Sequence, residues 1–267
     1  MGEMQGVDSS SWLKILREAS EAICFAVAEV QPRGAGLETR DYKHILDEVA
    51  QNALVDALSD QSISAQLISE EGNVLIGGGG PTVIADPIDG TTNLARGLHH
   101  AVTCLSASGN GLESGTLAAL VRDIYTGDVF VAEPGKGAKL NGCPIRVALP
   151  RQARSALVSV DISKTPKLDR VTPLLNVCRY IRMFGSSASE LTLIASGGFD
   201  AHVDIRGMVR ATDVAAALTI LKEAGGVYAV NSTISGDFTL TKETTMELVA
   251  ASNLPLLDEL LALTKCP

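Results

Sequence analysis

The sequence has no excess of positive charge and no long hydrophobic run. Its 22 Lys and Arg residues are outnumbered by 31 Asp and Glu residues, which gives a net charge of −9. Proteins that bind nucleic acids or anionic membranes through their surface need a basic face, so we expect neither partner. The chain also lacks a stretch of about 18 apolar residues, which argues against a membrane-spanning helix.

Cysteine and aromatic residues are also scarce. The five cysteines lie far apart, and no Cys-x-x-Cys or Cys/His spacing typical of zinc sites occurs. The first eleven residues lack the basic-then-apolar order of a secretory signal. We therefore expect reduced thiols in a cytoplasmic protein. Aromatic residues make up only 4% of the chain, which leaves few side chains to stack on the base of a nucleotide substrate.

The first 150 residues predict two helices followed by strands. Apolar residues at helical spacing predict helices over 12–30 and 45–58, with a loop over 32–40 between them. Segments bounded by turn residues then predict strands over 64–69, 82–85, 101–108, 115–122 and 128–132. We expect this part to be an α+β unit with an antiparallel sheet.

The residues after Pro150 predict an alternation of strands and helices. The predicted strands cover residues 156–160, 180–184, 201–205, 227–230 and 247–251. The predicted helices cover residues 167–178, 187–196, 213–224 and 254–263. This alternation favours an α/β unit, so we divide the chain into an N-terminal part (1–150) and a C-terminal part (151–267).

The segment Ala85–Asn93, which reads Ala-Asp-Pro-Ile-Asp-Gly-Thr-Thr-Asn, carries the strongest chemical signal. A predicted strand ends in Asp86, Pro87 fixes the following turn, and Asp89 comes three residues after the first carboxylate. Two carboxylates held this close repel each other unless a cation lies between them. Oxygen ligands of this kind suit Mg²⁺ or Ca²⁺, so the sequence predicts a divalent metal site at this strand end.

Further polar groups accompany this segment. Gly90, Thr91 and Thr92 offer consecutive backbone N–H groups that suit a phosphate. Glu70 ends an upstream strand, and Asp213 lies near the start of a predicted helix. Two cation sites beside a phosphate cradle imply metal-assisted phosphoryl transfer to water. Each acid alone has a simpler explanation, such as a solvated strand end or a helix cap, but the complete Asp-Pro-Ile-Asp-Gly-Thr string does not.

This string, preceded by a strand that ends in Glu70-Glu71, resembles the signature of the inositol monophosphatase superfamily. These are Mg²⁺-dependent, lithium-sensitive phosphatases, and the superfamily includes fructose-1,6-bisphosphatases. Residues 182–187 (Arg-Met-Phe-Gly-Ser-Ser) and 204–207 (Asp-Ile-Arg-Gly) are most similar to the archaeal branch, whose members often hydrolyse both inositol 1-phosphate and fructose 1,6-bisphosphate. The resemblance implies a layered αβαβα sandwich of the sugar-phosphatase type.

The resemblance also implies which residues hold the metal ions. Glu70, Asp86 and the backbone carbonyl of Ile88 would bind the first Mg²⁺. Asp86, Asp89 and Asp213 would bind the second, and a third, weaker ion would use Glu70. Mn²⁺ would substitute for Mg²⁺, and Li⁺ would inhibit.

The implied catalytic residues are Asp47, Glu70 and Thr91. Thr91, hydrogen-bonded to Asp47, would orient a metal-activated water for direct in-line attack, without a phospho-enzyme. The backbone N–H groups of Gly90 and Thr91 would hold the phosphate oxygens.

The implied substrate contacts combine hydroxyl-binding and phosphate-binding groups. They are Asp89, Gly90, Thr91, Arg182, Ser186, Ser187, Asp204 and Arg206. The serines and Asp204 match family positions that contact substrate hydroxyls. Arg182 and Arg206 match archaeal positions that face a sugar phosphate, and a guanidinium can bind a second phosphate through two parallel hydrogen bonds.

The chain departs from the family at its second signature. The usual pattern is Trp-Asp-x-Ala-Gly, whereas residues 212–216 read Thr-Asp-Val-Ala-Ala. The aspartate that would bind metal, Asp213, is retained, but the tryptophan and the glycine are not.

We therefore expect a Mg²⁺-dependent phosphomonoesterase acting on inositol 1-phosphate and fructose 1,6-bisphosphate. The alternative within the superfamily is a phosphatase of 3′-phosphoadenosine 5′-phosphate or NADP. The alternative from another class is a non-catalytic regulatory relative, which the presence of all four metal-binding carboxylates disfavours. Relatives are commonly dimers, so we also expect a homodimer. The sequence leaves open the physiological substrate, the number of metals in turnover and the strength of lithium inhibition.

Overall fold

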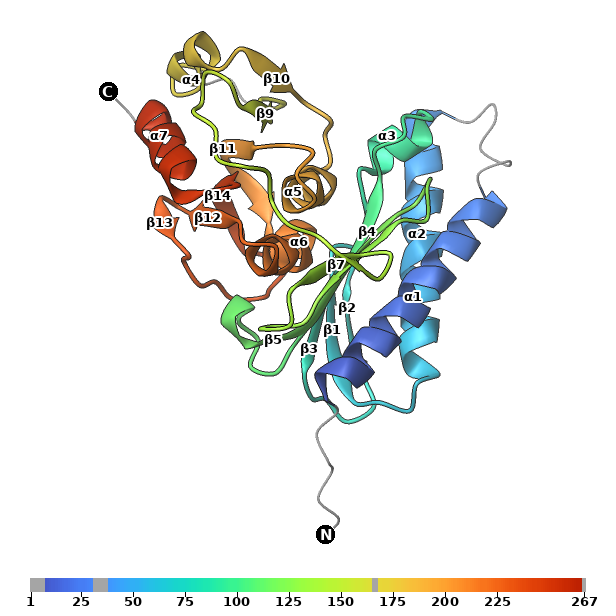
Figure 1. The fold of residues 1–267 in the computed structure, drawn as a ribbon. Coiled ribbons are helices and arrows are strands. Elements are labelled where there is room, and N and C mark those ends of the chain that lie inside the picture. Colours follow the sequence, from blue (N-terminus) through green and yellow to red (C-terminus); the bar gives the residue numbers. More distant parts are fainter. Residues whose placement is uncertain (1–7, 31–37, 165–167, 266–267) are drawn as a thin grey trace.

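The computed structural model describes residues 8–30, 38–164 and 168–265, and Figure 1 shows them in stacked layers. An outer pair of helices, an eight-stranded sheet, a middle pair of helices, a six-stranded sheet and a last pair of helices follow one another. This is the predicted αβαβα sandwich. The loop expected over residues 32–40 lies mostly outside the described residues.

The first helix layer consists of α1 (Ser9–Val30) and α2 (Thr39–Ser59). The carboxylate of Asp8 accepts a hydrogen bond from the backbone N–H of Ser11 at 2.7 Å, which caps the start of α1. Apolar residues repeat every three or four positions along both helices and are buried against the eight-stranded sheet. This layer therefore closes the outer face of the first sheet.

The eight-stranded sheet has the order β2-β1-β3-β4-β5-β6-β7-β8. Its strands are β1 (Ala65–Ser69), β2 (Asn73–Ile76), β3 (Thr82–Asp89), β4 (Val102–Ser108), β5 (Thr116–Asp123), β6 (Val129–Ala132), β7 (Ala138–Leu140) and β8 (Cys143–Pro144). β1 and β3 are parallel, and all other neighbouring pairs are antiparallel, so the predicted antiparallel sheet has one parallel pair. The short helix α3 (Thr91–Ala95) follows β3, and a 3₁₀ turn (Glu113–Gly115) precedes β5.

The middle layer consists of α5 (Ser187–Ala195) and α6 (Ala211–Glu223), which lie between the two sheets (Figure 1). Every residue of α6 from Ala211 to Leu221 is buried, as expected for a helix that is covered on both sides. The small side chains of Ala215–Ala217 let both sheets approach the helix closely. α6 can therefore deliver a side chain from its first turn into the space between the sheets.

The six-stranded sheet has the order β10-β9-β11-β14-β12-β13. Its strands are β9 (Leu157–Val160), β10 (Tyr180–Arg182), β11 (Ala201–Arg210), β12 (Val227–Val230), β13 (Thr233–Ile234) and β14 (Thr245–Ala251). The helices α4 (Thr172–Val177) and α7 (Leu254–Thr264) complete the last layer. Only β10, β9 and β11 are mutually parallel, so the predicted α/β alternation describes half of this sheet.

Two strands run further than the sequence predicts. β3 continues past Ala85 to Asp89, because a register shift between Asp86 and Asp89 accommodates Pro87. β11 continues past Ile205 to the start of α6, with a similar shift along its pairing with β14. Both extensions carry polar side chains to the same cleft. The helix predicted over 167–178 is instead short, since α4 begins only at Thr172.

The two sheets occupy consecutive stretches of the chain, residues 65–144 and 157–251. Both middle helices come from the second stretch, yet they share one apolar cluster with the first sheet, which includes Ile84, Leu191 and Leu218. The division near residue 150 into an N-terminal and a C-terminal part stays a prediction. In the described part of the chain, no helix combines the length and the apolar character needed to cross a bilayer.

Candidate metal and phosphate site

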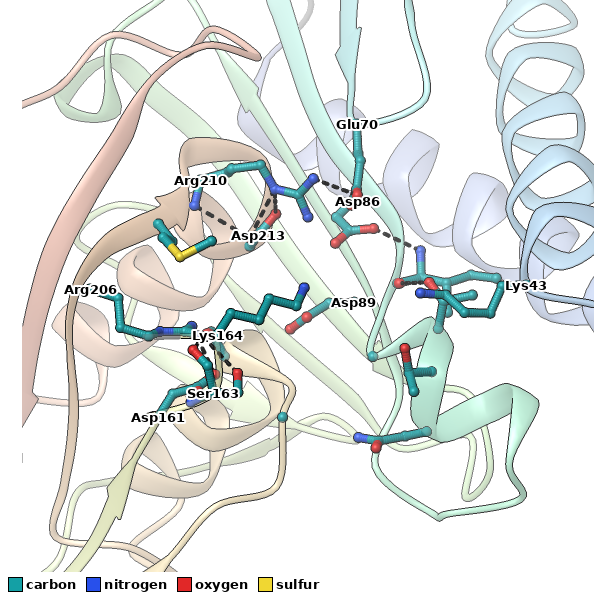
Figure 2. A pocket seen from close by; sticks show the side chains of 18 residues that line it. Lys43, Glu70, Asp86, Asp89, Asp161, Ser163, Lys164, Arg206, Arg210 and Asp213 are labelled. Atoms are coloured by element: carbon teal, nitrogen blue, oxygen red, sulfur yellow. Dashed lines mark hydrogen bonds and ion pairs between the residues drawn. The ribbon is translucent and has the colours of Figure 1, made fainter. Parts of the chain in front are cut away.

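A cavity of about 560 Å³ opens between the layers, at the ends of β3 and β11 and the starts of α5 and α6 (Figure 2). Its volume is typical of small-molecule sites. The predicted site residues that line it are Glu70, Asp86, Ile88, Asp89, Gly90, Thr91, Ser187, Arg206 and Asp213. The predicted site residues that do not line it are Asp47, Arg182, Ser186 and Asp204.

Three carboxylates form the acidic end of this cavity. Glu70, Asp86 and Asp213 each offer an oxygen, and these oxygens all lie within 4.8 Å of one another. Glu70 directly follows β1, Asp86 lies in β3, and Asp213 lies in the first turn of α6. The fold thus brings together two acids from the eight-stranded sheet and one from the helix layer between the sheets.

Burial and mutual repulsion disfavour the charged forms of Asp86 and Asp213. Burial raises the pKa of Asp86 well above its usual range, and the charges of Glu70 and Asp213 raise it further. Burial also raises the pKa of Asp213, although Arg210 acts in the opposite direction. Carboxylates whose repulsion is not relieved bind cations readily. Since the donors are all oxygen, the cluster fits a hard divalent ion such as Mg²⁺.

Arg210 places a cation of the chain itself in this cluster. Its Nη1 group donates a hydrogen bond to Glu70, and its Nε group donates to Asp213 Oδ1 at 3.1 Å (Figure 2). Burial lowers the pKa of Arg210, but the charges of Asp213 and Glu70 outweigh this effect and raise it. A bound metal ion and this guanidinium would therefore use oxygens of the same two carboxylates.

Asp89 connects the cavity to the start of α5. Its Oδ2 atom accepts hydrogen bonds from the Ser186 hydroxyl at 2.9 Å and from the backbone N–H of Ala188 at 2.7 Å. The partial positive charge at the start of α5 favours this carboxylate. Burial and the charge of Asp213 nevertheless raise the pKa of Asp89 to about 8. One oxygen thus anchors the helix, which leaves Oδ1 to contact a cation.

The turn after Asp89 requires glycine at position 90. Gly90 has a φ of 95°, in the left-handed region, and a Cβ atom there would lie 2.6 Å from the carbonyl oxygen of His100. Asn93 fixes the same turn, because its amide donates to the carbonyls of His100 at 2.8 Å and Phe184 at 2.7 Å. The turn that would hold a phosphate is therefore attached to the segment before α5 as well.

Replacing Gly90 with Ala is expected to destabilise the protein by about 3 kcal/mol, because the steric clash adds to the backbone strain. Gly97 is a matched control: its φ is 72°, but an added Cβ would meet no atom within 4 Å. Gly97→Ala should therefore cost only the strain, about 1 kcal/mol. Denaturant unfolding of both variants measures the difference. Equal losses would show that the segment around His100 moves to relieve the clash.

The structure brings Thr91 and Asp47 together below the cavity wall. The Thr91 hydroxyl lies 2.9 Å from the carbonyl oxygen of Ile88 and also reaches Asp47, so its single proton can be donated to only one of the two at a time. Burial raises the pKa of Asp47 to about 6, although a hydrogen bond with Thr91 acts in the opposite direction. The carbonyl of Ile88 retains a second lone pair, so it can still contact a cation.

A buried contact between a histidine and a glutamate supports the turn before α5. His202 and Glu190 have almost no exposed surface, and His202 Nδ1 lies 3.1 Å from Glu190 Oε2. The other oxygen of Glu190 accepts a hydrogen bond from the backbone N–H of Phe184 at 2.7 Å. This contact fixes the turn in which Ser186 reaches Asp89.

The two predicted phosphate-binding arginines are placed differently. Arg206 lines the cavity, whereas Arg182 is exposed away from it and donates to the carbonyl of its neighbour Ile181 at 2.8 Å. Asp204 is fully buried, and both of its carboxylate oxygens accept hydrogen bonds from Arg206. Substrate contacts of Arg182 and Asp204 stay predictions, which this geometry does not favour.

Comparisons with known proteins show the family of this chain. The model of the family described as the inositol monophosphatase family matches residues 10–264. The chain belongs to this family. The match runs from α1 to the end of α7, so it includes every acid of the cluster.

Relatives of this inositol monophosphatase family member are named as phosphatases or as Nus factors. A fructose-1,6-bisphosphatase/inositol-1-monophosphatase of Methanothermobacter thermautotrophicus is 32% identical over 231 residues, 81% of either chain. The Nus factor SuhB of Escherichia coli is 28% identical over 198 residues, 72% of either chain. A solved Pyrococcus horikoshii structure, described as having similarities to inositol-1 monophosphatase, has a TM-score of 0.83 and 25% identity, and covers 97% of this chain and all of its own. The predicted family and the layered fold are confirmed.

Three basic residues that line the cavity are missing from the set predicted from the sequence. Arg210 ends β11, and Lys164 follows β9, so both lie at strand ends, the criterion that identified Asp86. Lys43 comes four residues before Asp47 on α2, so helical spacing places both on one face. Helical spacing from Asp47 would have found Lys43. The strand-end criterion would have missed Arg210 and Lys164, because the predicted strands end at residues 205 and 160.

Proposed function

We propose that this chain is a Mg²⁺-dependent phosphomonoesterase that hydrolyses inositol 1-phosphate and fructose 1,6-bisphosphate. The observation that carries the proposal is the group of oxygens from Glu70, Asp86 and Asp213, which lie within 4.8 Å of one another beside the Gly90 turn. Membership of the inositol monophosphatase family supports the reaction class. A relative of similar length that is named for both activities supports the substrates.

The proposed mechanism divides the work between a metal ion and the chain. Mg²⁺ held by the carboxylates would supply positive charge to the phosphate and to the leaving oxygen. The backbone N–H groups of Gly90 and Thr91 would hold the phosphate oxygens. Asp47 lies outside the cavity, so the Thr91 hydroxyl would take a proton from the attacking water as it gives its own proton to Asp47, whose pKa is about 6. A solvent water would supply the proton that the leaving oxygen needs. Attack is direct and in line, so no side chain becomes phosphorylated.

The cavity wall favours a hydroxylated substrate over a nucleotide. Among the described lining residues none is aromatic, so an adenine base would find no ring to stack against. Thr92, Asn93, Ser163 and Ser187 line the same wall and offer hydrogen bonds to sugar or inositol hydroxyls. We therefore rank 3′-phosphoadenosine 5′-phosphate and NADP below inositol 1-phosphate and fructose 1,6-bisphosphate.

Phosphate release from a substrate panel tests the proposal. The purified chain should hydrolyse inositol 1-phosphate and fructose 1,6-bisphosphate with Mg²⁺, more slowly with Mn²⁺, and not at all with EDTA. Faster release from 3′-phosphoadenosine 5′-phosphate or NADP would overturn the substrate assignment. No release from any compound would favour the non-catalytic alternative. The oligomeric state, expected to be a homodimer, can be measured on the same sample.

A further inference from the structure

Arg206 has no hydrogen-bond donor free for a substrate phosphate. Its Nε and Nη2 groups donate to the two oxygens of Asp204, and Nη2 also lies 2.8 Å from Asp161 Oδ2. Its Nη1 group donates to the carbonyl oxygen of Ser163 at 2.9 Å and to the hydroxyl at 2.7 Å. All five N–H groups of a guanidinium are therefore used. Arg206 is paired with two carboxylates, Asp161 and Asp204, so these three side chains together do not attract an anion.

The contacts of Arg206 instead fix the loop that follows β9. Asp161 also accepts a hydrogen bond from the backbone N–H of Ser163 at 2.8 Å, which closes a tight turn. The next residue, Lys164, has a φ of 58°, a left-handed conformation that a residue with a side chain adopts only when its surroundings hold it there. Arg206 thus holds the turn that sets the direction of Lys164.

The side chain of Lys164 extends into the cleft, with its amino end directed toward Asp89 (Figure 2). Within the described residues its ammonium group makes no ion pair, whereas Arg206 and Arg210 are both paired with carboxylates. Lys43 is the other lining residue with an amino group, and it belongs to the helix that carries Asp47. Lys164 is therefore the cation on the β9 and β11 side of the cleft that is available to an anion.

We propose that Lys164 binds the second phosphate of a bisphosphate substrate and so determines the preference for fructose 1,6-bisphosphate over a monophosphate. This inference rests on the proposed function, in which the first phosphate lies at the Gly90 turn. An ammonium group is a compact charge that suits a phosphate without fixed orientation. The cavity, at about 560 Å³, has room for a sugar with a phosphate at each end. Arg206 acts as a positioning residue for this lysine.

Steady-state kinetics of Lys164→Met with both substrates tests the assignment. The KM for fructose 1,6-bisphosphate should rise about 10- to 100-fold, which is typical of a lost charged hydrogen bond, with kcat changed less than about threefold. The KM for inositol 1-phosphate should stay within about twofold. Lys164→Arg keeps the charge and should restore most of the bisphosphate affinity. Lys14→Met is the matched control, since Lys14 is an exposed lysine of α1 outside the cavity, and it should change neither constant.

The possible failures are distinguishable. If the unmodified chain hydrolyses neither compound, the proposed function is wrong, and this inference is wrong with it. If the unmodified chain hydrolyses both but Lys164→Met affects both equally or neither, only the assignment of Lys164 is wrong. A selective loss that Lys164→Arg does not restore would also overturn it, because the effect would then come from the loop conformation.

Discussion

Asp86→Asn is expected to lower phosphate release by about 10³-fold or more, the loss typical of removing one group that organises charge in an active site. Asp86 is the acid that the proposed site shares between both metal positions. In the unmodified chain, Asp86 Oδ1 accepts a hydrogen bond from the backbone N–H of Ile88 at 3.0 Å. Asparagine has the same shape and keeps an oxygen that can accept this hydrogen bond. The local turn should therefore persist while metal binding is lost.

The same substitution is expected to stabilise the protein in EDTA by about 1–2 kcal/mol, a few degrees in the unfolding midpoint. Burial and the charges of Glu70 and Asp213 raise the pKa of Asp86. When folding raises the pKa of an acid, the folded state disfavours its charged form. The free energy of unfolding therefore falls as the pH rises from the pKa of the unfolded state to that of the folded state. At neutral pH the neutral asparagine avoids this cost, so loss of activity and gain of stability should occur together.

Thermal unfolding in EDTA and in excess Mg²⁺ measures both effects. Mg²⁺ should raise the midpoint of the unmodified protein but not that of Asp86→Asn. Asp237→Asn is a matched control for which the opposite change in stability is expected. Partial burial raises the pKa of Asp237, but the hydrogen bonds from Ser114 outweigh this effect and lower it. Its loss should destabilise the protein slightly. Destabilisation of Asp86→Asn in EDTA would mean that the carboxylate has a structural rather than a metal-binding role.

The sequence allowed the acidic cluster to be predicted because one local string carries much of it. Asp86 and Asp89 belong to a single strand end, where spacing alone indicates a cation site. Glu70 and Asp213 are distant in sequence. A strand end and a helix start indicated them, and the family resemblance then implied their metal roles. Parallel β1 and β3 place Glu70 beside Asp86. The layered fold was predictable for the same reason, since the resemblance covers nearly the whole chain.

The basic half of the cavity depends on side-chain pairing, which spacing alone does not specify. Arg206 and Asp204 are two residues apart on β11, so they lie on one face of the strand and neutralise each other. That i, i+2 spacing was visible, but the resemblance implied separate substrate roles for the two residues rather than a pairing between them. The extension of β11 to Arg210 depends on a register shift along β14, a feature that no sequence pattern predicts.

Arg210→Gln is expected to have opposite effects on the metal-free protein and on metal affinity. Without its guanidinium, Glu70 and Asp213 lose their cationic partner. The protein in EDTA should lose about 1–2 kcal/mol of stability, a modest cost because the side chain of Arg210 is 35% exposed to solvent. Mg²⁺ or Mn²⁺ no longer has to displace the guanidinium from these oxygens. The dissociation constant for either ion should therefore fall about tenfold, which corresponds to about 1.4 kcal/mol.

Calorimetric titration with Mn²⁺ and unfolding in EDTA measure the two effects in separate experiments. Arg182→Gln is the matched control, since Arg182 is exposed outside the cavity, and it should change neither quantity. Weaker metal binding by Arg210→Gln would show that the guanidinium helps to assemble the site. Unchanged metal affinity with lost activity would instead place the guanidinium on the substrate. The guanidinium of Arg210 must leave Glu70 and Asp213 before a metal ion can enter. Its ion pairs with these two acids therefore predict that Arg210→Gln binds metal more tightly and is less stable without metal.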